Sequence, residues 1–268
     1  MSILNTRKDA FKQNKIKLDK TYSKLNMFSK KNILGIGFTN ATEDEILEYI
    51  LLGLEKGGQK YFIVTPNPEI LMLARNDTNY KNILNSAKLA LPDGIGIMMA
   101  GKILNKELKE KITGVDLVES LCRVVEEKPI TVGFVGAGPG VAEKTVECLK
   151  KRYPKLKVVF AGAEVVPPRR GSPRHFEDID ILFVAFGSPK QEIWIYENLE
   201  KLPVKVVIGV GGAFDFISGK VKRAPFWIRK AGFEWLFRLI NQPWRIKRQL
   251  VLIKFTYLVL KERFKRGV

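Results

Sequence analysis

The stretch GFVGAGPGVAEKTVECLKKRYP, Gly133 to Pro154, decides the class of fold. Its apolar beginning is typical of a buried β-strand, its glycines of a tight turn, and the remainder of an amphipathic helix. The dinucleotide-binding fingerprint G-x-G-x-x-G is incomplete, because Val141 stands where its last glycine belongs. An NAD-dependent oxidoreductase is therefore disfavoured. Two interpretations of the turn stay open: a tight turn for packing, or a turn beside a nucleotide diphosphate.

The same alternation of apolar and amphipathic segments runs through the middle of the chain. Several apolar segments show no polar alternation, which is typical of strands buried on both faces. Residues 42–57 indicate a helix, with Thr42 as N-cap and Glu45 in the capping-box position. We predict an α/β fold: a Rossmann-like, mostly parallel sheet with helices on both faces, plus a basic C-terminal helical appendage. The predicted strands are NILGIGF (32–38), KYFIVTP (60–66), KLALPD (88–93), ITVGFVGAG (130–138), KVVFAGAE (157–164), DILFVAFGS (180–188) and VKVVIGVGG (204–212).

The net charge of +18 is concentrated at the two ends of the chain. Residues 1–31 contain nine Lys or Arg against two acidic residues, and residues 219–268 contain fourteen against two. The stretch between them is close to neutral. This distribution indicates three parts: a basic arm over 1–31, an α/β body over 32–222, and a basic, aromatic appendage over 223–268. Two basic ends predict an anionic partner, either a membrane surface or a nucleic acid.

The few cysteines and histidines limit the chemistry that is expected. Cys122 and Cys148 lie in helical patterns with no signal peptide before them, which favours reduced thiols in a cytoplasmic protein. His175 is the single histidine, and no Cys/His group has zinc spacing. No D-x-D motif is evident either. We therefore expect no metal and no other cofactor.

Polar and glycine residues stand at the carboxyl ends of five of the predicted strands. Ligands of open α/β sheets bind outside the carboxyl ends of the strands, so these residues predict one site at one edge of the sheet. For Asp215 two roles stay open, capping a helix or touching a ligand, and capping is the commoner role for such an Asp. The strand ends are Thr65 with Asn67, Asp93, Gly136–Gly140, Gly187–Gln191 and Gly211–Asp215.

Seven blocks of this sequence resemble, in order, those of the WecG/TagA/CpsF family of bacterial glycosyltransferases. They run from about Thr65 to about Gln249, and their combination is far more specific than any one block. The blocks are TPNPEI, LPDGIGI, ITGVDL, FVGAGPGVAE, LFVAFGSPKQEIWI, GVGGAFDFISGKVKRAP and EWLFRLINQPWRIKRQ.

The resemblance implies a function. Family members transfer an N-acetyl amino sugar, typically N-acetylmannosamine, from a UDP-sugar to a sugar on polyprenyl diphosphate, for teichoic acid or other surface polysaccharides. It implies that residues 32–222 are a catalytic domain acting without metal. A direct displacement with one base would invert the anomeric centre.

The resemblance also implies roles for single residues. Asp93 matches the family's catalytic base, and its alternative role is to cap the following helix. Thr65, Asn67 and Gln191 match polar residues of the pocket. Lys111 stands where the family can carry an arginine, which keeps the charge but loses a bidentate contact with diphosphate. We expect Gly136, Gly138 and Gly140 to help bind the nucleotide, and Arg238, Arg245 and Arg248 to reach the diphosphate.

The C-terminal appendage combines aromatic side chains with dense positive charge. Leu250–Leu260 is too short to cross a bilayer, which takes about 20 apolar residues. It predicts an interfacial helix that holds the protein at the inner face of the cell membrane. The alternative is an amphipathic helix that docks on the body or on another subunit, and the apolar content of the appendage hints at a homo-oligomer.

A different class of function remains as the alternative to transfer. Net charge and interleaved aromatic residues are compatible with a basic nucleic-acid-binding module without catalysis. The charge, however, is at the chain ends, whereas the predicted polar site is on the neutral body. We therefore expect no nucleic-acid partner.

Overall fold

The computed structural model describes residues 28–57, 59–164, 178–243 and 246–265. Most of the predicted basic arm lies outside these residues. The boundary predicted after residue 31 falls within the first strand, β1 (Lys30–Ile33). The sole histidine, His175, also lies outside the described residues.

A six-stranded parallel sheet forms the centre of the protein, as predicted. Its strand order is β4-β3-β8-β7-β5-β6, and every pair in it is parallel. The central strand β7 is buried along its whole length, in agreement with its unbroken apolar run. The bounds are β3 (Tyr61–Val64), β4 (Leu89–Ala90), β5 (Thr131–Gly136), β6 (Lys157–Gly162), β7 (Ile179–Ala185) and β8 (Val204–Gly209).

The prediction of one strand over residues 32–38 was wrong. This segment forms the end of β1, a turn and most of β2 (Ile36–Thr39), and the two strands pair as a separate antiparallel hairpin. Leu34 and Gly35 both have positive φ, at 49° and 90°. Two consecutive positive φ values are the geometry of a tight two-residue hairpin turn, so the chain reverses inside the apolar run.

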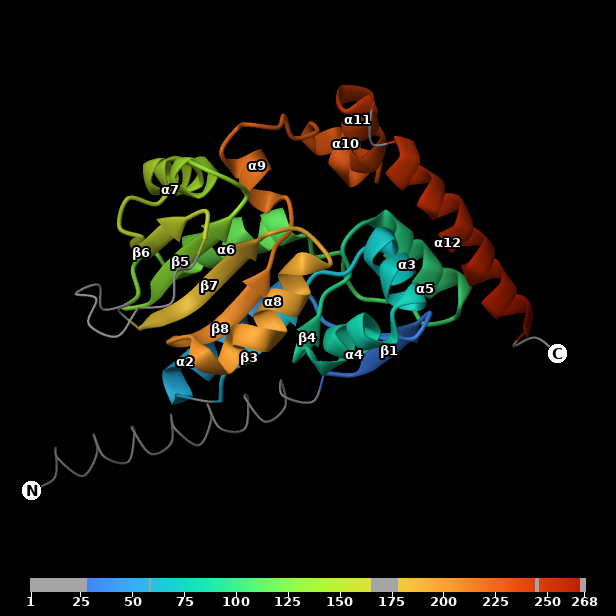
Figure 1. Ribbon diagram of the computed structural model, residues 1–268, viewed down its shortest axis with the longest axis horizontal. Coiled ribbons are helices and arrows are strands. Elements are labelled where there is room, and N and C mark those ends of the chain that lie inside the picture. Colours follow the sequence, from blue (N-terminus) through green and yellow to red (C-terminus); the bar gives the residue numbers. More distant parts are fainter. Residues whose placement is uncertain (1–27, 58, 165–177, 244–245, 266–268) are drawn as a thin grey trace, which may run out of the picture.

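Helices cover both faces of the sheet, which confirms that part of the prediction (Figure 1). Alternate residues of β7 point to opposite faces: Ile181 and Phe183 pack in one core cluster, Leu182 and Val184 in the other. The first cluster contains α2 (Glu43–Lys56), α6 (Gly114–Val125), α7 (Val141–Arg152) and α9 (Ala213–Ile217). The second contains α3 (Pro68–Asn76), α4 (Thr78–Ser86), α5 (Ile95–Ile103), α8 (Lys190–Asn198) and the 3-10 turn η1 (Leu199–Lys201).

Local signals that the sequence displayed are present. Thr42 caps α2, and with Glu45 it completes the capping box. Cys122 and Cys148 lie on α6 and α7, and both are free thiols.

The appendage is helical and packs on the body. It contains α10 (Phe226–Lys230), α11 (Glu234–Asn241) and α12 (Ile246–Lys265). Helix α12 lies along α3 and α5 at one end of the molecule (Figure 1). Its Phe255 and Val259 are buried in the second core cluster, and Lys106 pairs with its Glu262 at 3.3 Å. The docked arrangement is thus the one the structure adopts for this helix.

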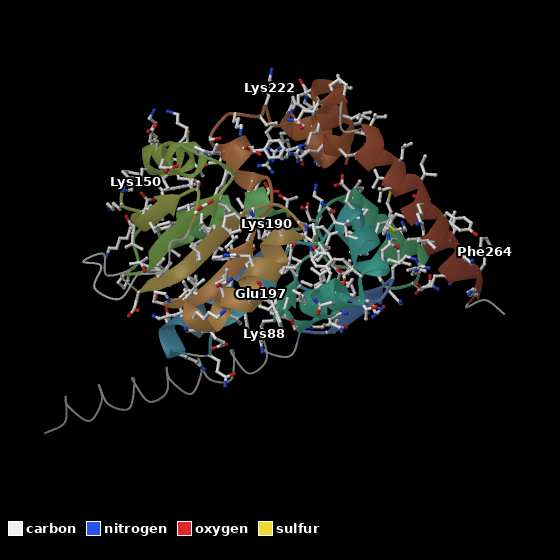
Figure 2. All side chains as sticks on the ribbon, in the orientation of Figure 1. Lys88, Lys150, Lys190, Glu197, Lys222 and Phe264 are labelled. Carbon is white, nitrogen blue, oxygen red and sulfur yellow. The ribbon has the colours of Figure 1, made fainter. Side chains whose placement is uncertain are left out.

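The other side of α12 carries an exposed apolar stripe. Its members recur at alternating spacings of four and three, which places them on one side of a helix. Among the described helices, none is long and apolar enough to cross a membrane. The stripe consists of Ile246, Leu250, Ile253, Tyr257, Leu260 and Phe264, the last at the far end of α12 in Figure 2.

Candidate active site

A pocket of about 810 Å³ lies at the carboxyl edge of the sheet. Five strands end at it: β3, β4, β5, β7 and β8 each contribute residues from the loop that follows them. The appendage completes the wall with residues of α11 and α12. The volume is within the range typical of ligand sites, and the position is the one where open α/β sheets bind ligands.

Asp93 lies in this pocket, three residues after β4 ends. Its backbone N–H donates to the Pro66 carbonyl at 3.2 Å, which ties it to the loop after β3. The alternative role as helix cap was wrong, because the N-cap of α5 is Gly94 and no side chain caps that helix. Position 96 requires glycine, because a Cβ there would stand 2.7 Å from the Pro68 side chain. Only glycine therefore allows α5 and α3 to begin this close together.

The surroundings of Asp93 favour a proton-accepting carboxyl group. Burial raises the pKa of Asp93 to about 7, and the negative charges of Glu234 and Asp116 add to this effect. The positive charges of Lys111 and Arg238 oppose it. A carboxyl group with a pKa near neutrality is well matched to general base catalysis, which requires the group to accept and release a proton at working pH.

Thr65 and Asn67 also line the pocket. The Thr65 hydroxyl donates to the Gly209 carbonyl at 3.1 Å, which joins the ends of β3 and β8. The Asn67 side chain accepts from the Ile70 N–H at 3.0 Å and caps α3. Both residues thus have structural roles at the rim, and the amide nitrogen of Asn67 is the group that the cap does not use.

Gln191 lines the pocket, is almost fully buried, and is held from two sides. Its Oε1 accepts from the Gly211 N–H and its Nε2 donates to Glu192, both at 2.9 Å. Glu192 also accepts from Ser188 at 2.7 Å and from Tyr80 at 2.8 Å. Burial raises the pKa of Glu192 above its usual value. This network fixes which way the Gln191 amide faces. Glu192 and Tyr80 do not line the pocket but hold a residue that does, and sequence analysis missed both.

The glycine turn after β5 is less directly involved than predicted. Ala137 is its member that lines the pocket, whereas Gly136, Gly138 and Gly140 are not part of the lining. Gly136 has a packing role, because a Cβ there would stand 2.7 Å from the Ala185 backbone. Gly138 and Gly140 have positive φ and open space around them, and Gly140 precedes α7 without a side-chain cap. No side chain therefore caps the start of α7, where the Val141 N–H donates to the Gly138 carbonyl at 3.3 Å.

Two predicted cationic residues reach the pocket. Lys111 lines it from the loop before α6, and Arg238 lines it from α11. The Arg238 guanidinium lies over the Phe216 ring, 4.8 Å from its centroid, and its Nε donates to Gln242 at 3.4 Å. Arg245 lies outside the described residues, and of Arg248 the structure describes the helical backbone in α12 but not the side chain.

A charged cluster that sequence analysis missed ties the appendage to the α/β body. The guanidinium of Arg223 lies 2.5 Å from the carboxylate of Asp116 and 3.5 Å from that of Glu234. Arg229 approaches Asp116 at 3.6 Å. Burial opposes ionisation of Asp116, but the Thr113 hydroxyl and the Arg223 charge outweigh it and hold its pKa below the usual value. Asp116 and Arg223 are 107 positions apart, so nothing in a single sequence pairs them.

Asp215 does not cap a helix. It lies inside the short helix α9, whose N-cap is Gly212, and its carboxylate pairs with Lys220 at 3.5 Å. Within the described part of the chain, no group of three or more His, Cys, Asp or Glu residues could hold a metal ion.

The fold and the pocket together define a Rossmann-like α/β protein whose site combines a strand-end carboxylate with cationic and glycine-turn groups. Comparison with known proteins specifies the family. The model of the glycosyl transferase WecG/TagA/CpsF family matches residues 31–268. The chain therefore belongs to the WecG/TagA/CpsF glycosyltransferase family, as the resemblance of its sequence blocks predicted.

Two relatives carry the same name, N-acetylglucosaminyldiphosphoundecaprenol N-acetyl-beta-D-mannosaminyltransferase. The one from Bacillus subtilis (strain 168) is 38% identical over 202 residues, covering 75% of this chain and 79% of the relative. The one from Staphylococcus aureus (strain MRSA252) is 30% identical over 240 residues, covering 88% of this chain and 94% of the relative.

Proposed function

We propose that this protein transfers N-acetylmannosamine from its UDP donor to N-acetylglucosamine carried on a polyprenyl diphosphate, in teichoic acid or other surface polysaccharide synthesis. The relatives' names give the transferred sugar and the acceptor, and those relatives match most of this chain. The single observation that carries the mechanism is Asp93 in the pocket with its pKa raised to about 7.

Asp93 is the general base of this reaction. It accepts the proton of the attacking acceptor hydroxyl as the oxygen bonds to the anomeric carbon of the donor sugar. The bond from that carbon to the diphosphate oxygen breaks, and its electron pair leaves with UDP. A single displacement of this kind inverts the anomeric centre.

The diphosphates are stabilised by cationic side chains and backbone N–H groups, without a metal ion or other cofactor. Lys111 and Arg238 are in the pocket beside Asp93 and supply positive charge. Arg245 and Arg248 belong to the same proposal, although their side chains lie outside the described residues. The uncapped start of α7 after Gly138 and Gly140 supplies N–H groups for the donor diphosphate.

The appendage attaches the protein to the anionic inner face of the cell membrane. Its surplus of positive charge and the exposed apolar stripe of α12 support this, because interfacial helices bind through both. Away from the membrane, the same stripe supports self-association. No nucleic-acid partner is proposed, since the pocket lies on the neutral body.

The test is transfer of labelled N-acetylmannosamine from its UDP donor to a lipid-diphosphate N-acetylglucosamine acceptor, with EDTA present. Wild type transfers, and Asp93→Asn loses at least ~10²-fold in kcat. Asp44→Asn, an exposed carboxylate in the first turn of α2, is the matched control and keeps wild-type activity. Full activity of Asp93→Asn would show that Asp93 is not the general base. Loss of wild-type activity in EDTA would contradict the metal-free mechanism. Binding of RNA but not of UDP would overturn the proposed function.

A further inference from the structure

The pocket has an apolar part that the transfer chemistry does not use. Beyond Asp93 and the cations, its lining continues over α3, α5 and α12 as a groove of apolar side chains. Leu73 comes from α3, Ile95 and Met99 from α5, and Phe255 and Val259 from α12. Figure 1 shows these three helices packed together at one end of the molecule.

The groove begins at the reacting centre because two of its helices begin there. Helix α3 starts directly after Asn67, and α5 starts two residues after Asp93. Both helices then continue along the apolar part of the lining, α3 through Leu73 and α5 through Ile103. At a rise of about 1.5 Å per residue, the pocket-lining positions Ile95 to Ile103 extend over roughly 12 Å. The apolar floor is thus continuous with the site that holds the base.

Exposure distinguishes the α3 and α5 side of this groove from ordinary core, whereas Phe255 and Val259 on the α12 side are buried. Met99 is 57% exposed and Leu73 42%, although both line the pocket. Apolar side chains that remain exposed inside a pocket indicate a site for an apolar ligand. Methionine suits a flexible hydrocarbon, since its unbranched thioether adapts to irregular shapes.

We propose that this groove binds the first two or three isoprene units of the polyprenyl acceptor. The inference rests on the proposed function, in which the acceptor joins a polar diphosphate to an apolar chain by a covalent bond. With the diphosphate beside Lys111 and Arg238, the chain leaves along α3 and α5, and α12 forms the opposite wall. An isoprene unit spans about 5 Å, from single-bond lengths of about 1.5 Å, so two or three units fill the groove.

Binding without catalysis gives the first test. Farnesyl diphosphate, with three isoprene units, and methyl diphosphate are titrated into the full chain in solution without membranes or detergent. Wild type binds farnesyl diphosphate at least ~10-fold more tightly, because apolar area leaves water. Met99→Asp and Leu73→Asp each remove most of this difference. Both positions are partly exposed, so the variants are expected to fold, which circular dichroism checks.

A matched control separates the groove from exposed apolar surface in general. Tyr196 is 55% exposed on α8 and does not line the pocket, so Tyr196→Asp keeps the wild-type preference. Equal binding of the two diphosphates by wild type, or an equal loss in all three variants, would overturn the groove. So would a loss of vesicle binding in Met99→Asp with its farnesyl preference intact, since the face would then serve the membrane.

Transfer assays with N-acetylglucosamine diphosphates bearing a methyl group or one to three isoprene units complete the test. The groove predicts that KM falls with each added unit up to the third and then stays constant. No transfer to any acceptor, with the farnesyl preference retained, would refute the proposed reaction and leave the groove standing. Transfer to all acceptors with the same KM would refute the groove and leave the proposed reaction standing.

Discussion

The phenolic hydroxyl of Tyr80 on α4 donates a hydrogen bond of 2.8 Å to the carboxylate of Glu192 on α8, and both residues are buried. Glu192 in turn accepts from the amide of its neighbour Gln191 at 2.9 Å. A contact between two helices of the core thereby sets the orientation of an amide at the pocket.

Replacing Glu192 tests this positioning role. Glu192→Ala leaves the Tyr80 hydroxyl and the Gln191 amide without their acceptor, which costs about 1–3 kcal/mol in the free energy of unfolding. It also lowers kcat/KM, because the amide is no longer held. Glu192→Gln keeps an acceptor oxygen and recovers part of both losses. Chemical denaturation and transfer kinetics measure the two effects.

The control for this series is on the same helix. Glu197 is exposed on α8 and is labelled in Figure 2, so Glu197→Gln leaves stability and kcat/KM unchanged. Equal kcat/KM in wild type and Glu192→Ala at a temperature where both are folded would show that Glu192 supports the core alone.

The pH dependence of transfer follows from Asp93. Its pKa is raised to about 7, and only the ionised carboxylate accepts a proton. The value of kcat/KM is therefore constant above about pH 8 and falls tenfold per pH unit well below pH 7. A pH–rate profile of wild type measures this limb. An acidic limb near pH 4, the ordinary value for Asp, would contradict the environment described for this carboxyl group.

Protein stability depends on the same group in the opposite direction to most carboxylates. The folded state binds the Asp93 proton more tightly than the unfolded chain, whose pKa is about 3.9. The contribution of Asp93 to the free energy of unfolding is thus fully present below about pH 4 and is lost as the pH rises through about 7. Asp93→Asn removes the loss, so its melting temperature exceeds that of wild type by a few degrees at pH 8 and much less at pH 5. A lower melting temperature at both pH values would mean that the carboxylate contributes stabilising contacts.

The appendage is held by the pairing of Arg223 with Asp116 at 2.5 Å. Arg223→Ala removes this contact. The attachment of the appendage to the body is then weaker by about 1 kcal/mol, since the pair is half-buried and Arg229 remains near Asp116. Helices α10 and α11 then exchange amide hydrogens faster, and kcat/KM falls because α11 carries Arg238. Lys222→Ala changes an exposed neighbour, labelled in Figure 2, and serves as the control. Unchanged exchange in Arg223→Ala would show that apolar packing alone holds the appendage.

Membrane attachment depends on the exposed stripe of α12. Leu250 and Leu260 are 58% and 42% exposed, so Leu250→Asp with Leu260→Asp lowers co-sedimentation with anionic vesicles by at least ~10-fold. The folded state is retained, because the buried side of α12 through Phe255 and Val259 is untouched. Equal co-sedimentation of the double variant would place membrane contact elsewhere. Sizing of both proteins without vesicles tests self-association through the same stripe.

The sequence by itself determined the class of fold and the edge of the sheet where the site lies. A strand buried on both faces needs an unbroken apolar run such as Ile181–Val184. Such a run can be recognised in the sequence without knowing which strands lie beside it. The same holds for the capping box of Thr42 and Glu45. The single error in the strands, at Leu34 and Gly35, arose because a hairpin turn can lie inside an apolar run when backbone torsion angles, not polarity, reverse the chain.

Tertiary structure alone decided which residues meet at the site. Asp116 and Arg223, or Tyr80 and Glu192, are more than a hundred positions apart and carry no pattern that pairs them. The pKa of Asp93, which lies in a loop, likewise depends on burial and on Glu234 of α11, a helix far along the chain that reaches the pocket only in the folded structure. Local propensities act within a few residues, whereas charge, burial and hydrogen bonding act through space. The sequence could therefore indicate Asp93, but only the folded chain gives that carboxyl group its properties.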